Sequence, residues 1–336
     1  MHNLITALLD GQSLNRSESS ALFSAIINGE VADVPLTAAI IAMKMRGESI
    51  DEIAGAADAL RAAATPFERP DYPLVDIVGT GGDGHHTINV STTASIVAAA
   101  AGAKVAKHGN RSVSSKSGSS DLLSELGVNL TMSPACARAS LDAANLTFLF
   151  APHYHAGVKH AMPVRQALKT RTIFNILGPL INPAQPQNMV LGVYLPELVS
   201  PIAQALVALG VNNAVVVHGS GLDELALHGD SIVQEIKDGA LLAKTQVSAA
   251  DFGLDNAPLE AIKGGTPEQN KAITLAILQG LATQAQTQAV VMNAAAALYV
   301  SGLANNFKEG AALAQAAIDS GATMTTLDKF VKASNQ

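Results

Sequence analysis

Cations and hydroxyl groups are concentrated in one short segment of this sequence, KHGNRSVSSKSGSSD at residues 107–121. The segment contains three Lys or Arg and six Ser, and no Asp or Glu occurs from Gly84 to Ser120. In a chain with a net charge of -7, this local excess of positive charge indicates an anion site. Ammonium, guanidinium, hydroxyl and backbone N–H groups all donate hydrogen bonds to phosphate oxygens. We therefore interpret the segment as a phosphate-binding loop rather than a flexible Gly/Ser linker.

A glycine-rich segment, GTGGDGHHTINVST at 79–92, is a candidate for a second phosphate-binding wall. Its spacing does not match the P-loop, which requires Gly-Lys-Ser/Thr at the end of the loop. Glycines let backbone N–H groups approach a ligand closely, and a helix N-terminus capped by Asn89, Ser91 or Thr92 favours phosphate. Taken alone, the segment fits an ordinary strand-to-helix turn equally well. The acid-free region beside it favours the phosphate site.

Two adjacent carboxylates, Asp223 and Glu224, follow the apolar run AVVVHG through a short GSGL turn. This places them at the carboxyl end of an expected strand, where open α/β sheets bind ligands. Mg²⁺ prefers one or two carboxylates together with waters and substrate phosphates. An acidic pair of this kind is more often a solvated turn, but a phosphate site elsewhere in the chain favours Mg²⁺ binding.

A stretch rich in basic residues, 148–183, contains three histidines, His153, His155 and His160. A zinc site is not expected, because no carboxylate lies between Asp142 and Glu197 and three histidines of unknown geometry are insufficient. His153 and His160 are interpreted as surface or core residues. The guanidinium of Arg165, together with His155, could instead bind an organic carboxylate.

The elements that must position these residues alternate between strand and helix patterns after residue 74, which predicts an α/β fold with a largely parallel sheet. Residues 1–65 read as short amphipathic helices, with Ser49 and Glu52 at capping-box spacing, and a Pro-rich stretch follows. Thr266, Pro267 and Gln269 predict the start of a C-terminal helix. The expected strands are 74–80, 103–106, 146–151, 189–195 and 214–219.

Composition excludes several classes of protein. With 336 residues and 48% hydrophobic content, the chain is long enough for one large domain or two smaller ones with a substantial core. The single Cys136 forms no internal disulfide and MHNLITALLD lacks a signal-peptide pattern, so we expect a cytoplasmic protein. No apolar run reaches the ~20 residues of a membrane helix. The negative net charge argues against nucleic acid as a partner.

The motifs GTGGD (79–83), NVST (89–92), KHGNRSVSSKSGSSD (107–121), RTIFNILGPLINPA (171–184) and VHGSGLDE (217–224) together resemble the anthranilate phosphoribosyltransferase family. They occur in the family's order along nearly the whole chain. The resemblance implies transfer of the phosphoribosyl group of 5-phosphoribosyl 1-diphosphate (PRPP) to anthranilate in tryptophan biosynthesis. It also implies Mg²⁺, with two ions per subunit, and a homodimer formed through the helical domain.

The fold implied by the resemblance is that of the nucleoside phosphorylases and phosphoribosyltransferases. A small helical domain, residues 1–68 joined by part of 160–185, would be linked to a larger α/β domain, residues 69–336. PRPP would bind between the two domains.

The resemblance also assigns roles to individual residues. The implied catalytic residues are Lys107 and Asn110, and the implied metal ligands are Ser91, Asp223 and Glu224. The residues implied to bind anthranilate are Gly79, His108, Asn110, His155, Arg165 and Gly178. The residues implied to bind PRPP are Gly79, Gly82, Asp83, Thr87, Asn89, Val90, Ser91, Thr92, Lys107, His108, Gly109, Asn110, Arg111, Ser112, Val113, Ser114, Ser115 and Ser119.

Two rival functions are considered. A pyrimidine nucleoside phosphorylase-like enzyme would share the architecture and a Lys- and Ser-rich phosphate loop. The paired carboxylates and the RTIFNILGPL segment argue against it. A catalytically silent relative that binds nucleic acid should lose the Asp223–Glu224 pair and gain a basic face, which the net charge of -7 opposes.

Overall fold

The computed structural model describes residues 1–111 and 116–336, and its centre is a single sheet. The described residues form seven strands in the order β3-β2-β1-β4-β5-β6-β7. Their bounds are β1 Val75–Gly79, β2 Val105–Gly109, β3 Leu146–Phe150, β4 Asn188–Gly192, β5 Asn213–Gly219, β6 Ser231–Lys237 and β7 Ala240–Val247. The first five strands are parallel, while β6 and β7 are antiparallel to their neighbours.

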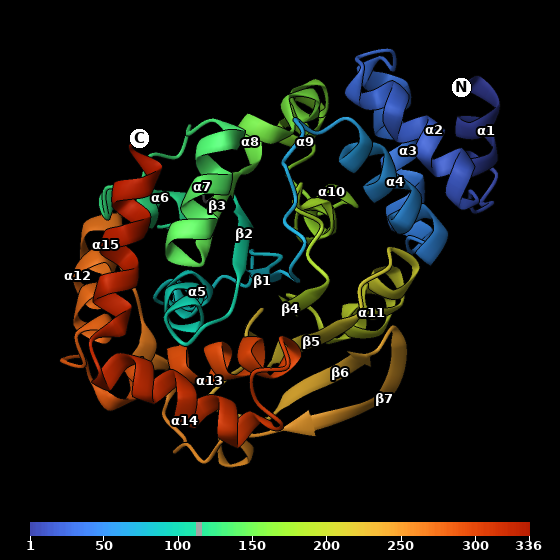
Figure 1. The fold of residues 1–336 in the computed structure, drawn as a ribbon. Helices are drawn as coiled ribbons and strands as arrows, with labels where there is room; N and C mark the ends of the chain where they lie inside the picture. The colour runs from blue at the N-terminus through green and yellow to red at the C-terminus, as the bar shows by residue number, and fades with distance from the viewer. Residues whose placement is uncertain (112–115) are drawn as a thin grey trace.

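Helices surround this sheet (Figure 1). The N-terminal helices are α1 His2–Leu9, α2 Arg16–Ile27, α3 Asp33–Arg46 and α4 Ile50–Ala62. Those between the parallel strands are α5 Val90–Ala100, α6 Ser119–Glu125, α7 Pro134–Ala144, α8 Ala151–Tyr154, α9 Met162–Leu168, α10 Phe174–Leu177 and α11 Val199–Ala208. The C-terminal helices are α12 Pro267–Leu278, α13 Gln284–Val300, α14 Phe307–Asp319 and α15 Ala322–Ser334. Among the described residues, no helix is both long enough and apolar enough to cross a membrane.

The order of the strands reverses beside β1. From β1 the chain proceeds to β2 and β3 on one side and later returns to β4 and β5 on the other. In open α/β sheets the crevice at such a reversal, at the carboxyl ends of the strands, is where ligands bind. The expected α/β class is therefore confirmed, and the sheet locates the candidate site at the ends of β1 and β4.

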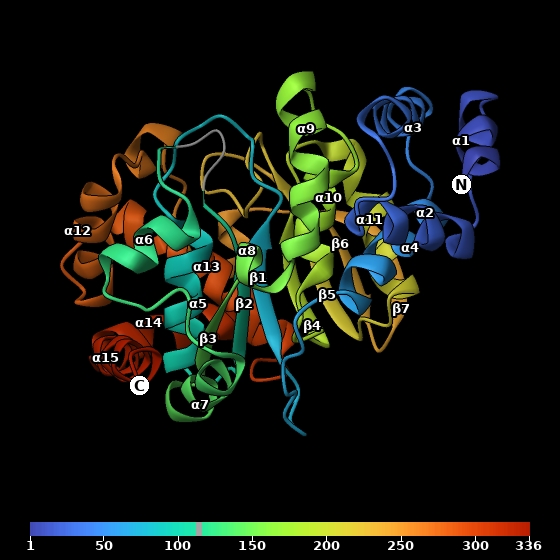
Figure 2. The same cartoon turned by 90° about the horizontal axis from the view of Figure 1, so that it is seen from above.

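Two hydrophobic cores cover the two faces of the sheet, because side chains of a strand alternate between faces. Val190 of β4 packs in a core with α5, α13 and α15, whereas Met189 and Leu191 pack in a core with α11 and the N-terminal helices. Val164 of α9 belongs to the second core. Figure 2 shows α1–α4 at one end of the molecule and α12 and α15 at the other.

Local signals identified most of these elements correctly. The capping boxes at Ser49 and Thr266 are present, and α3 ends at Arg46 before Gly47. All five expected strands exist, with bounds shifted by up to three residues at an end. No helix or strand lies between Ala62 and Val75, as expected for the Pro-rich stretch.

Two expectations were incomplete. The β6–β7 hairpin was missed, although its turn residues Asp238 and Gly239 are a typical hairpin pair; both have positive φ, 50° and 76°. The helix expected after the glycine loop begins at Val90, with Asn89 in the capping position, but the Asn89 side chain makes no capping hydrogen bond. It is used instead to bind a neighbouring loop.

Candidate active site

The glycine loop after β1 contacts the acidic turn after β5. Thr80 N donates to the carbonyl of Gly192 at the end of β4 (3.0 Å), and Gly81 N donates to Asp223 Oδ2 (2.5 Å). A Cβ at Gly79 would lie 2.1 Å from Asp223 Oδ2, so only glycine permits this approach. The carboxyl ends of β1, β4 and β5 therefore meet at one place, as the motifs predicted.

Glu224 binds the N-terminus of α5. Its Oε1 accepts a hydrogen bond from Ser91 N at 3.0 Å. A helix N-terminus presents unpaired N–H groups and a partial positive charge, which stabilise an anion. The acidic turn, the glycine loop and the helix N-terminus thus form one continuous polar wall, and Ser91 and Glu224, two of the three predicted metal ligands, are in direct contact.

The two carboxyl groups of this wall are poor acids. Burial, followed by the charge of Asp83, raises the pKa of Asp223 to about 7. Burial, followed by the charge of Asp223, raises the pKa of Glu224 well above its usual value. A divalent cation would compensate for the cost of burying two negative charges and for the repulsion between them. The two carboxylates therefore fit Mg²⁺. Within residues 1–111 and 116–336 no group of three or more His, Cys, Asp or Glu could hold a metal ion by itself. Substrate oxygens would have to complete the shell.

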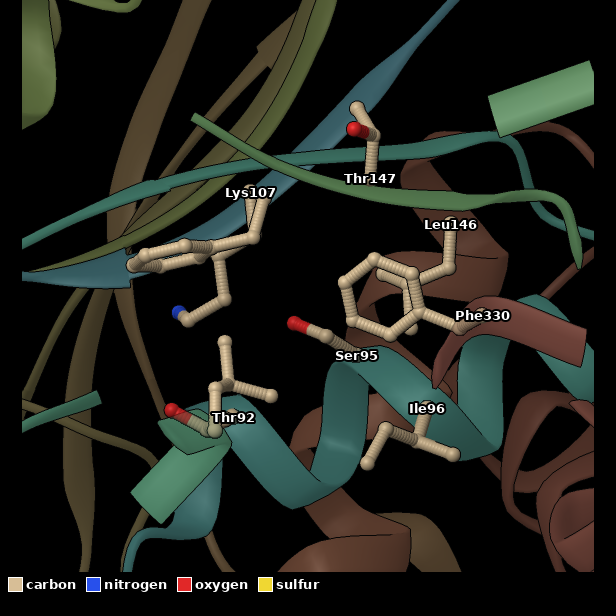
Figure 3. A pocket seen from close by; sticks show the side chains of 9 residues that line it. Thr92, Ser95, Ile96, Lys107, Leu146, Thr147 and Phe330 are labelled. Atoms are coloured by element: carbon tan, nitrogen blue, oxygen red, sulfur yellow. The ribbon is translucent and has the colours of Figure 1, made fainter. Parts of the chain in front are cut away.

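Lys107 lies on β2 next to this wall and is almost completely buried. Its Nζ donates to the carbonyl of Ile77 in β1. Figure 3 shows the side chain extending from β2 toward α5, on the side of Thr92 and Ser95. Burial lowers the pKa of Lys107, and the charges of Asp76, Glu224 and Asp223 oppose that change. A buried cation so close to two metal-type carboxylates is suited to bind an anion brought in with a metal.

The two predicted phosphate walls are joined by Asn89. Its Nδ2 donates to the carbonyl of Ser117, and its Oδ1 accepts from Ser117 Oγ, both at 3.1 Å. Within the 107–121 segment, Ser119 Oγ donates to the carbonyl of Asn110 at 3.3 Å, which brings residues 110 and 119 together. The structure therefore brings the glycine loop and the cationic segment together.

Other predicted PRPP residues lie around this junction. Gly82, Asp83, Thr87 and Gly109 are partly exposed, and Arg111 is exposed. Val90 and Thr92 are buried in this structure. The predicted contacts Ser112, Val113, Ser114 and Ser115 lie outside the described residues.

Two buried imidazoles form a second, uncharged wall. The rings of His108 and His155 meet edge to face with centroids 5.2 Å apart, and His108 Nδ1 lies 3.1 Å from the carbonyl oxygen of Gly178. The Nε2 atoms of both rings are buried without a hydrogen-bond partner among the described residues. A Cβ at Gly178 would meet nothing within 4 Å, so open space adjoins this pair.

Burial keeps both imidazoles neutral. It lowers the pKa of His108 to about 3 and that of His155 to about 4. A neutral imidazole with a free ring nitrogen can accept or donate one hydrogen bond. The wall suits a flat, partly polar molecule with hydrogen-bonding groups at its edge.

Two predicted anthranilate residues are less closely joined to this wall. Arg165 is half-buried on α9, and its guanidinium carbon lies 5.4 Å from the centroid of the Phe174 ring. No ion pair, hydrogen bond or ring contact within the described parts of the chain links Arg165 to His108 or His155. The exposed Asn110 uses its Oδ1 to accept from Arg111 N at 2.7 Å.

One contact at the site was not anticipated. Arg171 donates to the carbonyl of Gly82, and its guanidinium carbon lies 3.9 Å from the centroid of the Tyr194 ring. Tyr194 N in turn donates to Thr80 Oγ1 at 3.2 Å. The basic character of residues 148–183 indicated an anion site there, but nothing in the spacing of Arg171 indicated that it holds the glycine loop.

Comparison with known proteins shows the family to which the chain belongs. The model of the glycosyl transferase family helical bundle domain matches residues 2–64, and that of the glycosyl transferase family a/b domain matches residues 71–324. An anthranilate phosphoribosyltransferase of Shewanella baltica (strain OS185) is 59% identical over 340 residues, covering 99% of this chain and 95% of that protein.

Solved structures show the same similarity. The crystal structure of anthranilate phosphoribosyltransferase from Thermus thermophilus superposes with a TM-score of 0.95 at 41% identity, covering 99% of each chain. The Saccharomyces cerevisiae enzyme in complex with PRPP and Mg superposes with a TM-score of 0.91 at 28% identity, covering 99% of this chain and 97% of that one. Sequence and fold are thus shared along nearly the whole chain.

Proposed function

The chain belongs to the anthranilate phosphoribosyltransferase family, and on that premise we propose how its own residues transfer the phosphoribosyl group of PRPP to anthranilate. The anthranilate nitrogen forms a bond to the anomeric carbon of the ribose, the bond from that carbon to the diphosphate breaks, and the nitrogen releases one proton to the departing pyrophosphate or to water. The products are N-(5-phosphoribosyl)anthranilate and pyrophosphate. The contact that carries this proposal is the hydrogen bond from Ser91 N to Glu224. It joins a carboxylate suited to bind Mg²⁺ to a helix N-terminus suited to bind phosphate.

We infer that the diphosphate lies between the glycine loop and the cationic segment. The N-terminus of α5 contributes a partial positive charge and Lys107 contributes a buried one, while Thr80 N, Gly81 N and Ser91 N already donate to protein oxygens. Charge accumulates on the diphosphate as the bond to the ribose breaks, so donors already fixed in place stabilise the transition state most. The link from Asn89 to Ser117 supports this placement, since it holds both walls at one separation.

Mg²⁺ would be held by Asp223, Glu224 and Ser91, with two ions per subunit. The raised pKa values of both carboxyl groups support Asp223 and Glu224 as ligands, and the yeast relative solved with PRPP and Mg supports the use of Mg²⁺. When bound, Mg²⁺ neutralises charge on the departing pyrophosphate. Asp83, whose charge acts on both carboxyl groups, is suited to contact the hydrated Mg²⁺–PRPP complex.

Anthranilate would lie against His108, His155 and Gly178, with its carboxylate toward Arg165 and its amine toward the ribose. The unpartnered Nε2 atoms and the open space at Gly178 support this placement. An aromatic amine is already uncharged at neutral pH, so the attack requires no strong general base, and correct orientation is the main requirement. The neutral state of both imidazoles agrees with that requirement.

We propose that the protein is a cytoplasmic homodimer formed through its helical region. Large apolar side chains are exposed there, with Val34 80% and Met45 79% accessible on α3 and Leu9 59% accessible on α1. Exposed apolar side chains grouped on one region indicate a protein interface. Light scattering on the purified protein would give the mass of two chains, and replacing Val34 and Met45 with Ser should shift it toward one.

A product assay tests the function directly. Mass spectrometry after incubation with PRPP, Mg²⁺ and anthranilate should show phosphoribosylanthranilate and pyrophosphate in equal amounts. A parallel reaction with a pyrimidine nucleoside and inorganic phosphate should release no free base. Base release without phosphoribosylanthranilate would instead identify a nucleoside phosphorylase.

A further inference from the structure

Two buried asparagines on the C-terminal helices bind parts of the site without belonging to the set of residues proposed to touch substrate. Asn270 on α12 and Asn293 on α13 are each 1% exposed. We propose that Asn270 positions the glycine loop (79–92) relative to the cationic segment (107–121). We propose that Asn293 positions the turn that carries Asp223 and Glu224. This inference rests on the function proposed above.

Asn270 fixes the orientation of the amide that joins the two walls. Its Nδ2 donates to Asn89 Oδ1, and its own Oδ1 accepts from Gly265 N, both at 2.7 Å. Asn89 Oδ1 also accepts from Ser117 Oγ, so the Asn89 nitrogen is directed at the Ser117 carbonyl. An amide has one donating and one accepting end, and Asn270 selects which end of the Asn89 amide faces the Ser117 carbonyl.

The segment that leads into α12 follows the glycine loop closely. Ile88 N donates to the carbonyl of Ile262, and Gly264 N donates to the carbonyl of His86, both at 2.9 Å. Asn270 therefore closes a short series of contacts from α12 through residues 262–265 to the glycine loop and on to the cationic segment. Asn270 thus connects the two loops that are proposed to bind PRPP, the glycine loop and the cationic segment.

Asn293 binds the residue that follows the metal-type carboxylates. Its Oδ1 accepts from Leu225 N at 3.0 Å, and its Nδ2 donates to the Leu225 carbonyl at 3.2 Å and to the Ala289 carbonyl at 3.0 Å. Both backbone groups of Leu225 are thus held by one side chain. Because Leu225 directly follows Glu224, this fixes how the acidic turn presents its carboxylates.

Asn270→Asp is the most selective change. Aspartate keeps the oxygen that accepts from Gly265 N but, when ionised, has no N–H for Asn89 Oδ1. Two oxygens would then face each other, and the Asn89 amide would have to rotate away from Ser117. We expect the KM for PRPP and the dissociation constant of Mg²⁺–PRPP measured by calorimetry to rise about tenfold, the usual scale of one lost buried hydrogen bond. The KM for anthranilate should remain unchanged.

Asn213 provides a matched control. Its Nδ2 also donates to a second asparagine, Asn188 Oδ1, and its Oδ1 accepts a backbone N–H, that of Asp238, both at 3.1 Å. This pair lies at the amino ends of β4 and β5, at the edge of the sheet opposite the site. Asn213→Asp should therefore leave both KM values and Mg²⁺–PRPP binding unchanged.

Asn293→Ala separates the two roles. It should shift the Mg²⁺ activation curve and the Mg²⁺ dependence of PRPP binding to several-fold higher concentrations, with little change in the KM for anthranilate.

Asn270→Ala and Ser117→Ala break the Asn89 network without adding charge, and they test the link between Asn89 and Ser117 if Asn270→Asp does not fold. Circular dichroism and urea unfolding show which variants are folded.

The wild-type protein is measured first. If it does not bind Mg²⁺–PRPP, the proposed function fails, and this inference fails with it. If the wild type binds and the folded Asn270 variants bind equally well, the function stands but Asn270 is not a positioning residue. An equal rise in the KM for both substrates would likewise contradict selective positioning. An unchanged Mg²⁺ dependence in Asn293→Ala would remove Asn293 from the proposal.

Discussion

At the scale of single residues, the site combines two chemically different walls. On the diphosphate side, Lys107, Asp223 and Glu224 are charged groups whose pKa values are shifted toward the neutral form by burial. On the other side, His108 and His155 are neutral imidazoles, each with a ring nitrogen that has no hydrogen-bond partner among the described residues. The charged wall suits a polyanion that arrives with a metal, and the neutral wall suits the ring and uncharged amine of anthranilate.

Arg165 tests the assignment of the anthranilate carboxylate. Arg165→Ala should raise the KM for anthranilate and leave the KM for PRPP nearly unchanged, because its guanidinium has no carboxylate partner among the described residues. The loss of one charged hydrogen-bonding partner, about 1.5 to 3 kcal/mol, corresponds to a roughly 10- to 150-fold lower kcat/KM for anthranilate. Steady-state kinetics in each substrate measure both effects.

Arg165→Lys is the control for geometry. It keeps the charge but not the planar two-pronged donor, so an intermediate kcat/KM is expected. An equal effect of Arg165→Ala on both substrates would mean that Arg165 acts on the fold rather than on anthranilate.

The two buried histidines predict a loss of stability in mild acid. Each is neutral in the folded protein, with a pKa of about 3 for His108 and about 4 for His155, but protonates near 6.5 when unfolded. Their contribution is complete above pH 6.5 and is lost as the pH falls toward 4. Burial raises the pKa of Asp76 to about 6, that of Asp223 to about 7 and that of Glu224 well above its usual value, and these three carboxyl groups act in the opposite direction and offset the loss from the histidines.

Urea unfolding at pH 7 and pH 5 isolates the contribution of one histidine. Wild type should lose about 2 kcal/mol more unfolding free energy between these pH values than His155→Asn, the amount expected when one group binds a proton only in the unfolded state. Equal losses in the two proteins would show that His155 titrates normally in the folded state.

At the scale of secondary structure, the strand order decides where the site forms. The glycine loop follows β1 and the acidic turn follows β5, and the reversal between β1 and β4 brings these ends to one crevice. The β6–β7 hairpin extends the sheet on the far side and contributes no residue to the predicted site. Changes in this hairpin should therefore alter stability without altering catalysis.

Gly239 offers a test of that separation. Its φ of 76° disfavours other residues, while a Cβ there would meet nothing within 4 Å. Gly239→Ala should lower the unfolding free energy by about 1 kcal/mol through backbone conformation alone. Gly239→Asn, which tolerates positive φ, should cost less. Both KM values should match the wild type, and a changed KM for either substrate would show that the hairpin influences the site.

Sequence could predict the elements whose signals are local. The Ser49 and Thr266 capping boxes and the turn before Asp223 are examples, since each depends on residues within four positions. The Asp238-Gly239 turn carried an equally local signal that was overlooked. The stacking of Arg171 on Tyr194 and the use of Asn89 as a link to Ser117 could not be predicted in this way, because each joins segments 23 or 28 residues apart in a geometry that only the fold defines.

At the scale of the whole molecule, residues 170 and 171 connect the helical region to the glycine loop. Lys44 of α3 donates to Thr170, and the adjacent Arg171 donates to the glycine loop at Gly82. The N-terminal helices also share a core with one face of the sheet. A movement of the helical region would therefore be transmitted to the glycine loop, which we propose binds the diphosphate.

The central claim is that Mg²⁺ held by Asp223 and Glu224 supports the transfer, and one measurement tests it most directly. Loss of anthranilate fluorescence in the presence of PRPP is followed across a Mg²⁺ titration for wild type and for the Asp223→Ala/Glu224→Ala double variant. Wild type should be inactive without Mg²⁺ and saturate as Mg²⁺ rises, while the folded double variant should require far more Mg²⁺ or remain inactive. The same Mg²⁺ activation curve in both proteins would contradict the claim.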